Sequence, residues 1–142
     1  MRTGKKNNDP EFLAKIALND PYTSALCQAN VKIDDQKLLT GIAENDGDPL
    51  VRFEAIGKVT DQTLLEKIAA HDDTNFVREI AAERITDSRL LRNIASGQDE
   101  AAATGAIRVI EDKAFLEQLA QSTKTSEPVR KVAARRLKEL PE

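Results

Sequence analysis

A stretch of 26 residues recurs along the chain, and this repeat restricts the available folds more than any other feature. Residues 35–60 read DQKLLTGIAENDGDPLVRFEAIGKVT, and residues 61–86 read DQTLLEKIAAHDDTNFVREIAAERIT. Weaker copies lie on both sides. The five copies begin at aspartates spaced by 26, 26, 26 and 25 residues, which are Asp9, Asp35, Asp61, Asp87 and Asp112. A repeat of this length indicates an array of small, similar structural units.

The first half of each copy predicts a helix of about ten residues. Two apolar residues follow the opening aspartate, and a second pair comes three to four residues later, as in Leu64-Leu65 and Ile68-Ala69. Positions i, i+1, i+4 and i+5 lie on one face of a helix. The opening aspartate stands where the N-cap belongs, because a carboxylate there accepts hydrogen bonds from the first unpaired backbone N–H groups. Pro10 in the first copy suits the first helical position.

The second half of each copy predicts a polar turn and another helix. Val77, Ala81 and Ile85 are spaced by four, and the other copies repeat this pattern. The equivalent residues are Ala25, Ala29 and Ile33; Val51, Ala55 and Val59; Ala102, Ala106 and Ile110; and Val129, Ala133 and Leu137. A narrow stripe with alanine at its centre lets another helix approach closely. The fourth copy loses a residue near 98–100 and the fifth regains one near 124–127, both in predicted turns.

Neither helix of a copy can bury its apolar face alone. Five two-helix units stacked side by side, each covering its neighbour, form an α-solenoid. The sequence therefore predicts an all-α fold of ten helices in one domain over residues 9–142, after a disordered basic leader over residues 1–8. The polar ending LKELPE is consistent with a terminal cap. The expected repeats are 9–34, 35–60, 61–86, 87–111 and 112–142.

The motif LLxxIAxxDxxxxVR, present in residues 38–52 and 64–78, resembles the short bacterial HEAT-like repeats and also the leucine-rich-repeat-variant proteins. The resemblance covers residues 9 to about 140 and implies a right-handed superhelix of helix pairs. In the variant proteins one helix of each pair is a tighter 3₁₀-helix. The apolar spacing of four over residues 77–85 favours two α-helices here.

The same resemblance implies a ladder of polar bonds along the stack. In HEAT-like repeats the aspartate of the turn bonds to an arginine of the second helix. The matching residues are Asp46 with Arg52 and Asp72 with Arg78. Other copies lack one member: the first has Leu26 for the arginine, the fourth has Gln98 and Ala103, and the fifth has Arg130 without an acid. We expect these aspartates and arginines to be structural, with a complete ladder only in the central repeats.

The composition argues against several classes of protein. A single cysteine, Cys27, can form neither an internal disulfide nor a cysteine-clustered zinc or iron–sulfur site. A net charge of −3 argues against nucleic-acid binding by the whole surface. No apolar run approaches the roughly 18 residues that cross a membrane, and the basic start MRTGKKNN is not a signal peptide. We therefore expect a cytoplasmic protein in a reducing compartment.

Catalysis and cofactor binding have little support in the sequence. His71 is the only histidine, and other copies fill its turn position with Asn19, Asn45, Gly97 and Ser122, as is typical of a solvent-facing residue. A lone histidine can neither build a metal site nor complete a catalytic triad. No phosphate loop or dinucleotide fingerprint is present. We expect no enzyme, no metal site and no cofactor.

The outward face of the second helices is the best candidate for binding a partner. Positions opposite the buried alanines Ala55 and Ala81 must face outward. The candidates are three apolar anchors, Leu50, Phe53 and Phe76, with Glu79 and Glu83 setting the polarity beside them. Leu50 and Phe76 lie near helix starts and could instead pack against the adjacent repeat, so Phe53 is the stronger candidate. The leading hypothesis is a scaffold or adaptor that binds another protein.

A second hypothesis is that the same face binds an anion near its C-terminal end. Arg108, Lys131 and Arg135 lie on the outward rows; residues 112–142 sum to +2, whereas residues 9–86 sum to −7. These residues could bind an acidic partner or a nucleic-acid phosphate backbone. The alternative is a solvated helix whose basic end suits the helix dipole. The chain has no Trp and one Tyr for base stacking. A chromophore lyase is a third hypothesis, for which no residue can be named.

Overall fold

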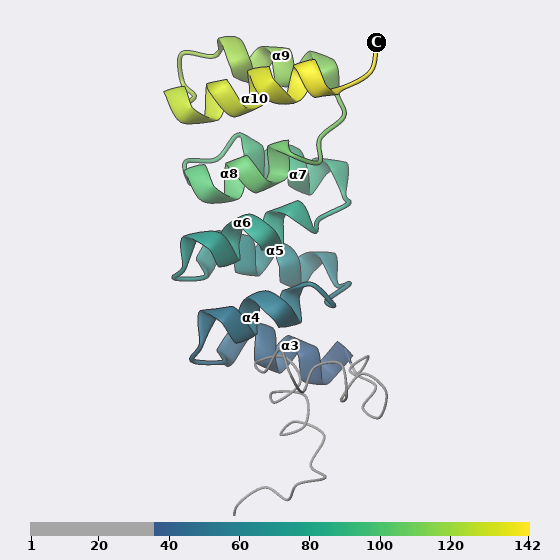
Figure 1. The fold of residues 1–142 in the computed structure, drawn as a ribbon, viewed down its shortest axis with the longest axis vertical. Coiled ribbons are helices and arrows are strands. Elements are labelled where there is room, and N and C mark those ends of the chain that lie inside the picture. Colours follow the sequence, from purple (N-terminus) through teal and green to yellow (C-terminus); the bar gives the residue numbers. More distant parts are fainter. Residues whose placement is uncertain (1–35) are drawn as a thin grey trace, which may run out of the picture. The chain divides into compact units, whose positions relative to one another are not determined.

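The computed structural model describes residues 36–142, which form eight α-helices and no strand (Figure 1). The helices are α3 (Gln36–Asn45), α4 (Pro49–Ile56), α5 (Gln62–His71), α6 (Asn75–Glu83), α7 (Ser88–Ala95), α8 (Glu100–Ile107), α9 (Lys113–Gln121) and α10 (Glu127–Glu139). The predicted all-α class is confirmed for these residues. The leader and the first copy, with Asp9, Pro10, Cys27 and the Asp35 cap, lie outside the described residues. No described helix combines the length and apolar character that a membrane span requires.

Each described copy of the repeat contains one pair of helices. The odd-numbered helix is the predicted first helix of its copy and has eight to ten residues. The even-numbered helix is the second, and it is an α-helix in every described copy, as the spacing of four predicts. The lost residue near 98–100 and the regained residue near 124–127 fall at the α7–α8 and α9–α10 connections. The helical registers are therefore unaffected by either length change.

The opening aspartates are N-caps, as predicted. One carboxylate oxygen of Asp61 accepts from the N–H groups of Thr63 and Leu64 at 3.0 and 3.3 Å. Asp87 caps α7 in the same way, and Asp112 caps α9 by accepting from the Phe115 N–H at 3.1 Å. Each carboxylate satisfies N–H groups that have no partner inside the helix, which explains why an aspartate recurs at the start of the copies.

The chain divides into two compact units at the boundary between the second and third copies, between Thr60 and Asp61. The described part of the first unit is the pair α3 and α4, which pack against each other. Leu39 and Ala43 of α3 are fully buried, as are Ala55 and Ile56 of α4. The boundary between the units thus coincides with a predicted repeat boundary.

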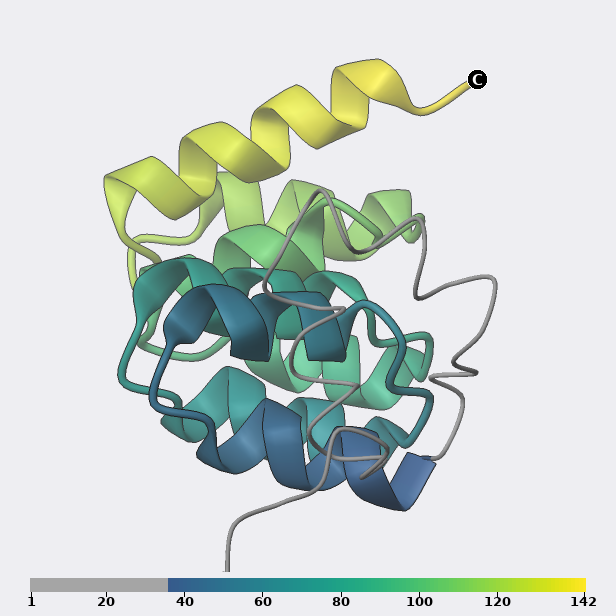
Figure 2. The ribbon, with the colours of Figure 1, turned by 60° about the horizontal axis from the view of Figure 1, so that its bottom comes forward.

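The second unit contains three helix pairs, α5 with α6, α7 with α8, and α9 with α10. Helix α6 packs on α8, α8 packs on α10, and α5 contacts α7. In Figure 1, α6, α8 and α10 follow one another in one layer, and α5, α7 and α9 lie in a second layer. Helix α10 is the longest described helix and is the yellow helix at the top of Figure 2. The second helices of three consecutive copies therefore form one layer of this unit.

The predicted stripes form the core of each unit. The central alanines Ala81, Ala106 and Ala133 have no exposed surface. The other buried stripe residues of the second unit are Leu64, Leu65, Ile68, Ala69, Val77, Ile85, Leu91, Ala95, Ala102, Ile110, Leu116, Leu119 and Val129. Leu90, Ile94 and Leu137 are half-buried. Complete burial of a large apolar side chain such as leucine or isoleucine stabilises the fold by about 1.5–3 kcal/mol. These stripes therefore supply most of the stabilisation.

Helices α6 and α8 approach each other closely at Gly105 of α8. A Cβ atom added to this residue would lie 2.1 Å from the carbonyl oxygen of Glu79 and 2.9 Å from its carbonyl carbon. Both atoms belong to the backbone of α6, which cannot rotate away as a side chain can. Only glycine therefore fits at position 105 with the present spacing of α6 and α8.

A glutamine at the start of α5 holds the connection that follows α6. The Oε1 atom of Gln62 accepts from the N–H groups of Thr86 and Asp87 at 2.7 and 3.3 Å. In the first unit, Gln36 bonds to Thr60 N–H in the equivalent way at 3.1 Å. In these two copies the glutamine after the opening aspartate therefore forms a hydrogen bond with the threonine that ends the copy.

Replacement of Gln62 with alanine should lower the free energy of unfolding by about 1 kcal/mol, because backbone N–H groups of the connection lose their acceptor. The matched control is Gln118→Ala, at an exposed position of α9, which should have almost no effect. Urea unfolding measures the stability, and hydrogen exchange measures protection of the Thr86 amide. Equal exchange of that amide in the two variants would contradict a role for Gln62.

Candidate functional site

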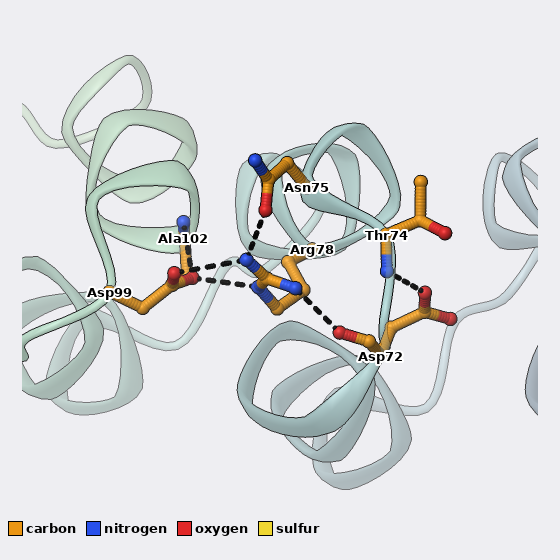
Figure 3. A network of polar contacts seen from close by, with 6 residues as sticks. All are labelled: Asp72, Thr74, Asn75, Arg78, Asp99 and Ala102. Carbon is orange, nitrogen blue, oxygen red and sulfur yellow. Dashed lines mark hydrogen bonds and ion pairs between the residues drawn. The ribbon is translucent and has the colours of Figure 1, made fainter.

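Arg78 of α6 is the centre of a polar network in the second unit (Figure 3). Its Nη1 donates to the carbonyl oxygen of Asp72 at 2.7 Å, and Nη2 donates to the side chain of Asn75. Its Nε and Nη2 bond to the two carboxylate oxygens of Asp99 at 2.9 and 3.2 Å. The Arg78 side chain is only 16% exposed. This guanidinium therefore connects the turn of the third copy to the turn of the fourth.

Asp99 has two structural roles at once. It pairs with Arg78, and it caps α8 by accepting from the Ala102 N–H at 3.0 Å. Burial alone would raise the pKa of Asp99, but the Arg78 hydrogen bond, the Ala102 N–H and the Arg78 charge outweigh it and hold the pKa below its usual value. The hydrogen bond to Asp99 raises the pKa of Arg78 further above its usual value. Both groups are therefore charged at neutral pH.

The expected ladder is corrected in two respects. Arg78 bonds to the backbone carbonyl of Asp72, while the Asp72 carboxylate accepts from the Thr74 N–H at 2.9 Å and shapes the turn. The acid that Arg78 pairs with is Asp99, one position after the Gln98 that the repeat alignment selects. Asp99 is the N-cap of α8, the position that Thr74 occupies at α6, so the pair joins Arg78 to the N-cap of the next copy's second helix. The expectation that these residues are structural agrees with their contacts.

The same carbonyl bond recurs in the other copies that have the arginine. Arg52 donates from Nη1 to the carbonyl oxygen of Asp46 at 2.7 Å. Arg130 donates to the carbonyl oxygens of Ser122 and Thr125, although its copy has no matching acid. The arginine of the second helix therefore binds the backbone of its own turn, with or without an aspartate there.

The three apolar candidates differ in exposure, and their order is not the expected one. Leu50 is 62% exposed and Phe76 is 40% exposed, so neither is packed away at its helix start. Phe53, the stronger candidate from the sequence, is half-buried. Leu50 and Phe53 belong to α4 in the first unit, and Phe76 belongs to α6 in the second. Phe76 is the exposed apolar candidate in the layer of α6, α8 and α10.

The structure brings together charged residues that the sequence assigns to two separate hypotheses. Arg108, at the C-terminal end of α8, forms an ion pair with Glu79 of α6, and its Nη1 lies 3.7 Å from Glu83 Oε2. The acids expected beside the apolar anchors therefore balance one of the expected anion-binding residues. The three side chains join α6 to α8 on the outer side of their contact.

The other two basic candidates lie on α10 and have different surroundings. Lys131 pairs with Glu127 on the same helix at 3.1 Å, with both side chains mostly exposed, so this pair contributes little. Arg135 is exposed and has no hydrogen bond or ion pair with any residue in the described part of the chain. The neighbouring Arg136 donates from Nε to the carbonyl oxygen of Ile110 at 3.0 Å. Arg135 is thus the basic candidate whose charge is not balanced by a described acid.

A groove between α8 and α10 gathers two of these basic candidates. Its volume is about 270 Å³, and it is lined by Thr104, Arg108, Val132, Arg135, Arg136 and Glu139. Lys131 does not line it. The lining residues include three guanidinium groups and one carboxylate, and Glu79 and Glu83 pair with one of these guanidinium groups, that of Arg108. The sequence pattern predicts Arg108 and Arg135 as candidates, but their common groove depends on how α10 packs on α8.

The residues considered for catalysis and metal binding in the sequence have the following positions. His71 is exposed at the end of α5, where the repeat alignment predicts a solvent-facing residue. Within residues 36–142, no group of three or more His, Cys, Asp or Glu side chains could hold a metal ion. Cys27 lies outside the described residues.

Comparison with known proteins finds no match for this chain among protein families, curated proteins or solved structures.

Proposed function

We propose that the chain is an α-solenoid of about five HEAT-like repeats and a non-enzymatic scaffold or adaptor that binds another protein. Three features support the repeat architecture: one helix pair in each described copy, the packing of α6 on α8 and α8 on α10, and the Arg78–Asp99 pair between two copies. The motif LLxxIAxxDxxxxVR supports the HEAT-like type. The partner binds to the layer of second helices.

The observation that carries this proposal is the exposure of Phe76 on α6. A phenylalanine with 40% of its surface exposed contributes about 1 kcal/mol or more when a partner covers it. Aromatic side chains in the centre of an interface supply much of its affinity. Glu79 and Arg108 lie along the same layer and provide a charged border. In the first unit, Leu50 is an exposed apolar residue at the equivalent position of α4.

Phe76→Asp should weaken partner binding at least tenfold, which corresponds to about 1.4 kcal/mol, because a charge replaces the apolar anchor. The matched control is Ala114→Asp, which places the same charge at an exposed position of α9 in the other layer. Affinity capture from the native cells, followed by quantitative mass spectrometry, compares the proteins recovered by each variant. A photo-crosslinking amino acid at position 76 then marks the proteins that touch this site.

The proposal fails if folded Phe76→Asp protein recovers the same proteins in the same amounts as the unchanged chain. Circular dichroism and thermal unfolding establish that both variants are folded. Equal losses with Ala114→Asp would also contradict it, because a general effect of added charge would then explain the result.

A further inference from the structure

The groove between α8 and α10 has a composition suited to an anionic group. Arg108, Arg135 and Arg136 line it together with Thr104, Val132 and Glu139. We propose that this groove binds an acidic side chain of a partner peptide, so that the partner combines an apolar residue over Phe76 with acidic residues further along. This inference rests on the proposed function and specifies the chemistry of the partner.

Two of the guanidinium groups are held in place before any ligand binds. Arg136 is bonded to the carbonyl oxygen of Ile110 at 3.0 Å and lies 3.6 Å from Glu139 Oε2, with 19% of its side chain exposed. Arg108 is held by Glu79 and Glu83. Binding therefore immobilises few additional side-chain torsions, which lowers its entropic cost. A guanidinium also offers a planar pair of donors that matches a carboxylate.

The third guanidinium supplies the unbalanced charge. Arg135 is exposed and has no polar partner among the described residues, whereas Arg108 and Arg136 each have one or more acidic neighbours. An incoming carboxylate can therefore pair with Arg135 without displacing an existing ion pair. This residue should determine most of the affinity for an anion.

The size and border of the groove favour a peptide over a nucleic acid. A volume of about 270 Å³ accommodates one or two side chains. Glu139 lines the groove, and Glu79 and Glu83 border it at Arg108, so a continuous row of phosphates would meet repulsion. No aromatic side chain lines the groove to stack on a base. Separate acidic side chains can approach Arg135 while avoiding the glutamates.

The order of the helices in the layer fits one extended segment. Helix α6 packs on α8, and α8 packs on α10, as Figure 1 shows. A segment that crosses the layer meets Phe76 on α6, then the Glu79–Arg108 pair, and then the groove. The apolar and the acidic requirements therefore belong to different parts of the same partner.

The test measures binding of a fluorescein-labelled octaglutamate peptide to the full chain by fluorescence anisotropy at low salt. Arg135→Glu should weaken binding at least tenfold, about 1.4 kcal/mol, because the unbalanced cation becomes an anion. The matched control is Arg89→Glu, the same reversal at an exposed position of α7 in the other layer, which should change the affinity less than twofold. Added salt should weaken binding, because charges near the surface are screened.

Three further probes define the chemistry. An octaglutamine peptide should not bind, a phosphoserine peptide should bind through the same Arg135-dependent site, and oligothymidylate of similar length should bind more weakly than octaglutamate. If oligothymidylate bound more tightly than octaglutamate, and this binding depended on Arg135, the ligand of the groove would be a nucleic acid and the peptide proposal would be wrong. Absence of saturable octaglutamate binding, or equal weakening by Arg89→Glu, would overturn the inference. Octaglutamate has no apolar residue, so its binding should be unaffected by Phe76→Asp, and either proposal can fail without the other.

Discussion

Replacement of Gly105 with alanine should destabilise the second unit by about 2 kcal/mol. The new Cβ atom would lie 2.1 Å from a backbone oxygen of α6, so α6 and α8 must separate by about 1 Å. Overpacking of this kind costs about 3 kcal/mol when backbone must move, and the better helix propensity of alanine returns about 1 kcal/mol. Urea unfolding followed by circular dichroism gives the change in free energy.

The control is the same substitution where no collision occurs. Gly41 lies in the interior of α3, and no described atom is within 4 Å of a Cβ added there. Gly41→Ala should therefore stabilise its helix by up to about 1 kcal/mol through propensity. If Gly105→Ala were also neutral or stabilising, the close approach of α6 and α8 would be wrong.

Gly105 shows one limit of sequence reasoning. It lies in EAAATGAI, where a small residue among alanines carries no distinctive signal. Its importance depends on the distance between two helices from different copies, which periodicity does not define. The stripe residues Ala102 and Ala106 were predictable, because spacing by four is a local property of the helix that carries them.

Asp99 shows a second limit. The caps Asp61, Asp87 and Asp112 were predictable because they recur at the start of the copies. Asp99 is instead the N-cap of the second helix in its copy, as Asp48 and Thr74 are in theirs, and the repeat motif does not mark that position. The capping rule contains the missing signal, since Asp99 directly precedes the helix-forming segment that begins at Glu100.

The candidate site shows a third limit. Helical periodicity gives the direction in which a side chain points, and it places Leu50, Phe53 and Phe76 on the outward face. Two of these residues, Leu50 and Phe76, are exposed. Periodicity does not predict which outward side chains are covered by neighbouring groups, and Phe53 is half-buried. Charge counting likewise treats Arg108 as available, although it pairs with Glu79, which lies 29 residues earlier.

Asp99→Asn should destabilise the protein by about 1–2 kcal/mol at neutral pH. Asparagine caps a helix about as well as aspartate, so this change removes the charge that faces Arg78 and retains the bond to the Ala102 N–H. The Asp99 side chain is 40% exposed, so water screens part of the attraction and the loss should lie toward the lower value. Asp99→Ala removes the cap as well and should cost about 2–3 kcal/mol in total.

The destabilisation by Asp99→Asn should depend on pH. The pKa of Asp99 is lower in the folded protein than in the unfolded chain, so the unfolded state binds a proton first as the pH falls. The stability that the charge provides is complete above the unfolded value of about 4 and disappears as the pH falls through the folded value. The difference between the unchanged protein and the Asn variant should therefore be constant from about pH 5 to 8 and shrink below about pH 4.

The control for this experiment is Asp87→Asn. Asp87 caps α7 with bonds to the N–H groups of Arg89 and Leu90 at 2.9 and 3.2 Å, but it has no guanidinium partner among the described residues. Its replacement should cost less than about 0.5 kcal/mol, through the helix dipole alone. Equal effects at positions 87 and 99 would show that the cap matters and the Arg78 pair does not. A difference for Asp99→Asn that persists unchanged at pH 3 would contradict the lowered pKa, because below about pH 4 proton uptake by the unfolded chain must reduce the stability that the charge provides.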